Sequence, residues 1–89
     1  MDPFLHEERA VLARRIRESL LEMVGDHPKG LLMAVAARVN TIYPNVYRVL
    51  REMIDEGLIE PMGRTKGRRY FLSTRGEAQL HALRARDRP

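Results

Sequence analysis

The hydrophobic residues change their spacing at Gly57, and this change limits what the second half of the chain can form. Before it, apolar residues follow the i, i+3, i+4, i+7, i+8 spacing of one helix face, which predicts a helix over 44–56. This stripe consists of Val46, Val49, Leu50, Met53 and Ile54. After it, the runs 58–62 and 69–73 have the length and composition of strands, and the Gly63–Gly67 loop joins them into a hairpin.

Three more helices are expected from patterns of the same kind. The first covers 3–24, ends at Gly25, and turns inward a stripe of Leu5, Leu12, Ile16, Leu20 and Met23. Three further apolar residues give this helix more apolar surface than a single core needs, because they lie off the stripe: Phe4, Val11 and Leu21. The second helix covers about 31–38, with inward positions at Leu32, Ala36 and Val39. The last covers 74–86, is capped by Ser73, and turns inward Leu80 and Leu83.

Length and composition exclude several classes of protein. With 89 residues, the chain has the size of one small domain, so a multidomain enzyme with a deep substrate cleft is excluded. The lack of cysteine excludes disulfides, thiolate zinc sites and cysteine nucleophiles. No apolar run reaches the roughly 18 residues of a transmembrane helix, and no signal-peptide pattern is present. The expected location is therefore the cytoplasm, without membrane contact.

Positive charge is concentrated in one short segment. Residues 63–75 contain no acid and five bases, which are Arg64, Lys66, Arg68, Arg69 and Arg75. On the expected helix 44–56, the outward face carries Arg48 and Arg51 in its first half, whereas all the acids lie in its second half. This order opposes the helix dipole, which favours acids near the N-terminus. Both features indicate an anionic partner, nucleic acid before a membrane surface.

Each of these features also has a purely structural explanation. Arg48 with Glu52, and Arg51 with Asp55, have the i,i+4 spacing of ion pairs on a solvated helix face. Basic residues on a hairpin also prevent its edges from pairing with the strands of another molecule.

The order of helix, short helix, turn, helix and hairpin is that of a winged helix-turn-helix domain. In that fold the second helix of the turn unit enters the major groove, and the hairpin, called the wing, lies along the backbone or minor groove. We therefore expect a mainly helical α+β fold in a single domain over 1–89. Its expected parts are an N-terminal helical extension (1–15), the helix-turn-helix (31–57), the wing (58–73) and a C-terminal helix (74–86).

Two segments resemble the PadR family of regulators. Tyr47-Arg48-Val49-Leu50, Met53 and Glu56-Gly57-Leu58-Ile59 resemble the family's Tyr-x-x-Leu-x-x-Leu-x-x-x-Gly-Leu-Ile stretch. Residues 67–76 resemble its Gly-Arg-x-Tyr-x-Leu-Thr-x-x-Gly segment, although much of this motif also occurs in the MarR and ArsR families. The resemblance implies a dimeric winged-helix transcription factor, usually a repressor, in which Asn45, Tyr47 and the wing arginines contact DNA.

The chain departs from the PadR pattern at both ends. The family's Gly-Tyr-Glu is replaced by Gly30-Leu31-Leu32, and its long C-terminal dimerisation helices are missing or reduced to 74–86. An N-terminal extension of about ten residues instead lengthens the first helix. We therefore expect a dimer interface built from Phe4, Leu5, Val11 and Leu12, together with Leu80 and Leu83.

The sequence thus predicts a regulator that binds double-stranded DNA sequence-specifically as a dimeric repressor associated with the nucleoid. Base edges are expected to contact Asn45 and Arg48, and phosphates at the edge of the groove to contact Thr41, Tyr43, Tyr47 and Arg51. The flanking backbone is expected to contact Arg64, Lys66, Arg68 and Arg69. The alternative is a winged-helix module for protein interaction, or an architectural or replication-partition role that uses the same surface.

No catalytic, cofactor or metal site is expected. The three histidines His6, His27 and His81 are scattered, and only His81 with Glu77 has the spacing of two ligands on a helix, which is too few for a site. No serine or threonine has a convincing His/Asp arrangement around it. A small-molecule effector held by the tyrosines and phenylalanines stays open as an alternative without direct support.

Overall fold

The computed structural model describes residues 3–26, 30–64 and 68–87, and only the backbone for residues 3–7. Its elements are α1 (Pro3–Met23), α2 (Leu31–Val39), α3 (Tyr43–Asp55), β1 (Ile59–Met62), β2 (Arg69–Leu72) and α4 (Thr74–Arg86). Every helix and strand that the hydrophobic pattern predicts is present, with ends that differ by at most one residue.

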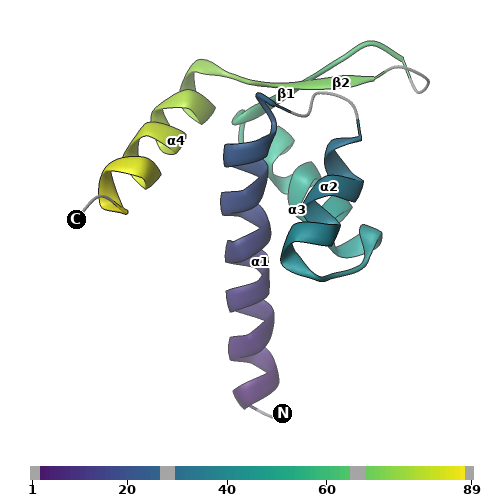
Figure 1. Ribbon diagram of the computed structural model, residues 1–89, viewed down its shortest axis with the longest axis vertical. Coiled ribbons are helices and arrows are strands. Elements are labelled where there is room, and N and C mark those ends of the chain that lie inside the picture. The colour runs from purple at the N-terminus through teal and green to yellow at the C-terminus, as the bar shows by residue number, and fades with distance from the viewer. Residues whose placement is uncertain (1–2, 27–29, 65–67, 88–89) are drawn as a thin grey trace.

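The long helix α1 lies at the centre of the molecule, and the other elements pack around it. In Figure 1, α2 and α3 lie on one side of α1 and α4 lies on the other. The strands form a two-stranded antiparallel sheet in which Ile59 is opposite Leu72 and Met62 is opposite Arg69. The same figure shows the hairpin extending from the base of α4 past α2 and α3, and the N-terminal half of α1 projecting beyond the rest of the domain.

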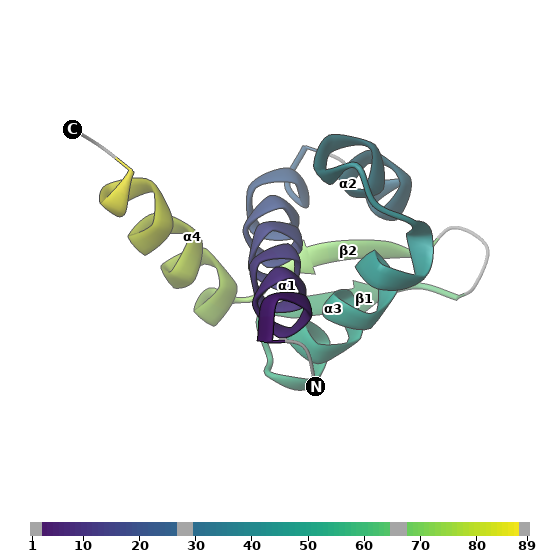
Figure 2. The same cartoon turned by 90° about the horizontal axis from the view of Figure 1, so that it is seen from below.

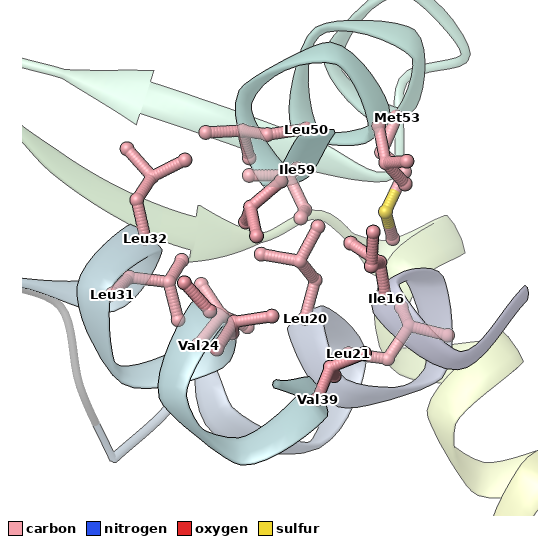
Figure 3. Close-up of a cluster of buried hydrophobic side chains, with 14 of the residues drawn as sticks. Ile16, Leu20, Leu21, Val24, Leu31, Leu32, Val39, Leu50, Met53 and Ile59 are labelled. Carbon is pink, nitrogen blue, oxygen red and sulfur yellow. The ribbon is translucent and has the colours of Figure 1, made fainter. Parts of the chain in front are cut away.

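One hydrophobic core joins α1, α2, α3 and the base of the hairpin (Figure 3). Leu20, Leu50 and Met53 have no exposed surface, and Ile59 brings the start of β1 into the same cluster. The predicted inward positions of α2 are confirmed, since Leu32, Ala36 and Val39 are all buried. The core comprises Ile16, Leu20, Leu21, Val24, Leu31, Leu32, Val35, Ala36, Val39, Val46, Val49, Leu50, Met53, Leu58 and Ile59.

The prediction that Leu21 is surplus apolar surface is wrong. Leu21 is 4% exposed and belongs to the core. It also lines the groove between α1 and α4, next to Leu83 of α4, which is itself buried. A helix with partners on two sides buries a wider apolar arc than one stripe, so the single-stripe pattern underestimated how much of α1 is enclosed.

The turn between α2 and α3 is fixed by Asn40. Its φ of 60° is in the left-handed region, which Asn tolerates better than most residues. The backbone N–H groups of Asn40 and Thr41 donate to the carbonyls of Ala37 and Ala36, at 3.3 and 2.9 Å. These bonds close the end of α2 and direct the chain into α3.

A tight joint connects the end of α3, the start of the hairpin and the beginning of α4. Gly57 ends α3 with a φ of 76°, and Leu58 then donates its N–H to the carbonyl of Met53 at 2.9 Å. Ser73 caps α4 as predicted, because its Oγ accepts the N–H of Gly76 at 3.0 Å. The same hydroxyl donates to the carbonyl of Gly57, and the Ser73 N–H donates to that of Leu58. The base of the hairpin is thereby tied to both α3 and α4.

Four helices and a two-stranded antiparallel sheet in this order form a mainly helical winged-helix fold, which confirms the predicted fold class. In the described part of the chain, no helix combines the length and apolar character needed to span a membrane.

Candidate nucleic-acid interface

The outward face of α3 presents basic side chains that pair with no acid among the described residues. Val46, Val49, Leu50 and Met53 face the core, so Arg48 and Arg51 are turned outward and are exposed. Within the described residues, no side-chain nitrogen of either arginine lies within 4.0 Å of a carboxylate oxygen, so neither i,i+4 pair forms. The described residues therefore do not support the alternative explanation, in which these arginines serve only as ion-pair partners on the helix surface.

The ion pairs that do form lie on other faces of the molecule. Arg17 of α1 is 2.8 Å from Glu56 at the end of α3, and Arg38 of α2 is 2.8 Å from Glu22 of α1. Arg86 at the end of α4 is 3.1 Å from Glu18 of α1. Hydrogen bonds to Asp87 and Glu18 raise the pKa of the Arg86 guanidinium above its ordinary value. These pairs connect α1 to its three neighbouring helices, and none involves an outward residue of α3 or of the hairpin.

The wing contributes three exposed arginines from the ends of its two strands. Arg64 follows β1, Arg68 precedes β2, and Arg69 is the first residue of β2. None of them is within ion-pair distance of a carboxylate in the ranges that the structure covers. The fourth predicted wing base, Lys66, lies outside the described residues.

The wing and α3 meet in a groove. A cavity of about 360 Å³ is bounded by Met33 of α2, Tyr43 and Tyr47 of α3, and Arg68 and Tyr70 of the wing. The rings of Tyr43 and Tyr47 are stacked, with centroids 6.4 Å apart and planes 11° from parallel. In Figures 1 and 2, the N-terminal end of α3 and the strand ends that lead to the hairpin loop lie on the same side of the molecule, opposite α4. Of the predicted contacts, this groove brings together Tyr43 and Tyr47 of α3 and Arg68 of the wing.

The two segments that supply most of this surface contain no acidic residues. Residues 30–51 and 61–76 contain no Asp or Glu, although the chain has 12 of them. These two segments supply α2, the first half of α3 and most of the hairpin. The acids of α3 begin at Glu52, in its second half. A polyanion on this side would therefore meet positive charge with little repulsion.

The two helices of the helix-turn-helix begin without a side-chain cap, in contrast to α4. Neither Gly30 before α2 nor Ile42 before α3 caps the first turn with its side chain. The first N–H groups of a helix that are not capped bind external acceptors such as phosphate oxygens. Among α2, α3 and α4, whose first turns are described, the two helices that start without a side-chain cap are those at or next to the groove, whereas α4 has its cap from Ser73.

Asn45 and Thr41, predicted as separate DNA contacts, are hydrogen-bonded to each other. The Nδ2 of Asn45 donates to the Oγ1 of Thr41 at 2.9 Å, and both residues are half-buried. Asn45 also lines a cavity of about 600 Å³ between α1 and α3, together with Arg9 and Arg48. The bond braces the turn before α3, so Asn45 has a positioning role in addition to the base contact predicted for it.

The residues predicted for a dimer interface have different surroundings. Val11 is 45% exposed, whereas Leu12 and Leu80 are half-buried against the core. Leu83 is 8% exposed and is enclosed by the chain itself. The side chains of Phe4 and Leu5 lie outside the described ones. Within the chain that is described, Val11 is therefore the most exposed apolar member of this set.

Two exposed apolar residues near the groove were missed by the sequence reasoning. Met33 is 65% exposed and Ile42 is 64% exposed. The pattern of α2 contained a signal for the first, because Met33 lies off the inward positions Leu32, Ala36 and Val39. Ile42 lies in the turn, where helical spacing gives no information.

Two solved structures resemble this fold over nearly the whole chain. A MarR family transcription regulator matches with a TM-score of 0.67 and 26% sequence identity, over 96% of this chain and 64% of its own. A mutant of MepR from S. aureus matches with a TM-score of 0.65 and 18% identity, over 92% of this chain and 69% of its own. The chain thus spans somewhat less than two thirds of the length of the first protein. The sequence matches no protein-family model and no curated protein.

Proposed function

We propose that the protein is a transcriptional regulator that binds double-stranded DNA sequence-specifically, with α3 in the major groove and the wing on the backbone. It acts as a homodimeric repressor in the cytoplasm, associated with the nucleoid, and is not an enzyme. The proposal rests on the exposed arginines of α3 and the wing, none of which pairs with a carboxylate among the described residues, and on the groove where Tyr43 and Tyr47 of α3 lie near Arg68 of the wing.

The roles of the basic residues follow from where their elements meet DNA. A helix entering the major groove brings its N-terminal half to the base edges, so Arg48 contacts bases and Arg51 contacts phosphate. Tyr43 and Tyr47 border the groove toward the wing and contact the backbone through their hydroxyls. Lys66 and the exposed wing arginines hold the flanking phosphates, beyond the reach of α3.

The comparisons support this assignment at the level of class. One similar structure is described as a transcription regulator of the MarR family, and its fold extends over nearly all of this chain. The narrower resemblance to PadR regulators remains a prediction from the motif around Tyr47 and the segment 67–76.

The experiment that tests the proposal measures affinity for a labelled random-sequence duplex at several salt concentrations by fluorescence anisotropy. Each phosphate contact contributes about −0.9 to the slope of log K against log salt. The double substitution Arg68→Ala with Arg69→Ala is expected to weaken binding to all duplexes alike and to reduce the slope by about 1 per lost contact. A matched control, Arg15→Ala with Arg84→Ala, removes two exposed charges from α1 and α4 and is expected to leave the slope unchanged.

Two outcomes contradict the proposal. If the wing variant and the control had equal slopes of log K against log salt, binding would depend on the overall charge of the protein rather than on this surface. If wild type bound no duplex even at low salt, DNA binding would be excluded and a protein-interaction module favoured.

The dimer is tested separately by sedimentation equilibrium of the full chain. We expect a dimer at micromolar concentration, held together by the projecting half of α1. Val11→Glu introduces a charge at the most exposed apolar position among the described members of the predicted interface and is expected to shift the mass toward the monomer. A wild-type monomer at tens of micromolar would rule out the dimer.

A further inference from the structure

Exposed apolar side chains gather around the start of α3. In the described part of the chain, seven large apolar or tyrosine side chains are exposed. Four of them, Met33, Ile42, Tyr43 and Tyr47, lie on α2, the turn and the first half of α3. Met33 and the two tyrosines border the same groove. We call these four residues the apolar patch.

The apolar patch is held by rigid parts of the fold. The neighbours of Met33 along α2, Leu32 and Ala36, are buried in the core, and so is Val46 on α3. Asn40 and the bond between Asn45 and Thr41 fix the turn that carries Ile42. The exposure of the patch is therefore set by the core packing, and its members cannot turn inward without disrupting the domain.

The surroundings of the patch identify what covers it. Arg48 and Arg51 lie on the adjacent face of α3, Arg68 lies across the groove, and residues 30–51 contain no acid. A protein partner for an apolar patch would have to be acidic around its edge, whereas a DNA groove is bounded by phosphates along its whole length. Within the major groove, the C5-methyl group of thymine is the apolar feature that distinguishes one base pair from another.

From this charge complementarity we infer that the apolar patch reads thymine methyl groups, so that the preferred site contains T·A pairs where α3 enters the groove. This inference rests on the proposed DNA-binding function and adds to it a class of sequence. Met33 and Ile42 supply aliphatic contact, and the ring faces of Tyr43 and Tyr47 supply a flat apolar surface. Arg48 then reads a neighbouring guanine, next to rather than within the T·A segment.

The test first selects bound duplexes from a randomised pool with the full-length protein. Each T·A pair that is enriched is then replaced in turn by U·A, which removes one methyl group and preserves base pairing. Burying one methyl group is worth about 0.8 kcal/mol, so each methyl that is contacted is expected to change the affinity about fourfold.

Variants assign the effect to the patch. Met33→Ala is expected to reduce the preference for T over U, whereas Tyr47→Phe preserves the apolar ring and is expected to retain it. Met62→Ala is the matched control. Met62 is also an exposed methionine, 58% accessible, but it lies on the other face of the sheet from Tyr70, away from the groove.

The outcomes distinguish a failure of the inference about thymine methyl groups from a failure of the proposed DNA-binding function. Enriched sites that bind equally well with U in place of every T would overturn the inference while leaving the DNA-binding function intact. Loss of the T preference in Met62→Ala to the same degree as in Met33→Ala would also overturn it. A pool with no enrichment, from a protein that binds no duplex at low salt, would overturn the DNA-binding function itself.

Discussion

Gly76, in the first turn of α4, packs directly against the backbone that begins the hairpin. A Cβ added to Gly76 would lie 2.1 Å from the carbonyl oxygen of Leu58 and 3.0 Å from the Cδ2 of Leu72. Ordinary contact begins near 3.4 Å, so Gly76→Ala requires the backbone on one side to move by about 1 Å. The atom that it meets is main chain, so a change of side-chain rotamer does not relieve the clash.

The magnitude follows from three contributions. Overpacking of this kind costs about 1–3 kcal/mol. Displacement of the Leu58 carbonyl also weakens the hydrogen bond that it accepts from the Ser73 N–H at 3.0 Å, which is worth about 1 kcal/mol. Alanine is favoured over glycine within a helix by about 1 kcal/mol, which offsets part of the loss. We expect Gly76→Ala to lower the free energy of unfolding by about 2 kcal/mol and the melting temperature by roughly 8–16 °C.

The assay is urea denaturation followed by circular dichroism, with the slope m compared between variants to establish that the same surface unfolds. Gly25→Ala is the matched control, because no atom lies within 4 Å of its added Cβ and its φ is not positive. It is expected to leave stability unchanged or raise it by up to about 1 kcal/mol. If Gly76→Ala unfolded at the same urea concentration as the control, the reasoning about the joint would be refuted.

Three further predictions concern the α4 cap, the α1–α4 ion pair and DNA specificity. Ser73→Ala removes the cap of α4 and is expected to lower the free energy of unfolding by about 1–2 kcal/mol in urea denaturation. Ser73→Thr keeps a hydroxyl, so an equal loss in that variant would contradict the role of the cap. Arg86→Gln breaks an exposed pair with Glu18, so it should lower the free energy of unfolding only slightly in the same denaturation assay, and this loss should vanish in high salt. Arg48→Ala is expected to reduce discrimination between the selected site and a random duplex by about 1–3 kcal/mol in competition binding, and equal losses on both duplexes would exclude a base contact.

The sequence alone determined the elements and their order, because those follow from local patterns. The i, i+3, i+4 stripe of α3 required a helix, which ends at Gly57. Gly63 marked the turn of the hairpin, and Ser73 marked the start of α4. The cluster of basic residues over 63–75 is likewise fixed by the sequence, because these residues are neighbours along the chain however it folds. These signals act over a few residues, which is why the ends of the elements could be placed to within one residue.

Only the tertiary structure decided which side chains share a surface and which have partners. Sequence spacing allowed Arg48 and Arg51 to pair with acids one helical turn away, but in the described part of the folded chain neither of these pairs forms. Packing of α4 against α1 buried Leu21, which helical periodicity had placed outside the core. The groove that joins Tyr47 to Arg68 depends on where α3 and the wing lie relative to each other. Such contacts join residues far apart in the sequence, 21 positions for Tyr47 and Arg68 and 62 for Leu21 and Leu83. Their geometry is set by the packing of whole elements rather than by the pattern within any one of them.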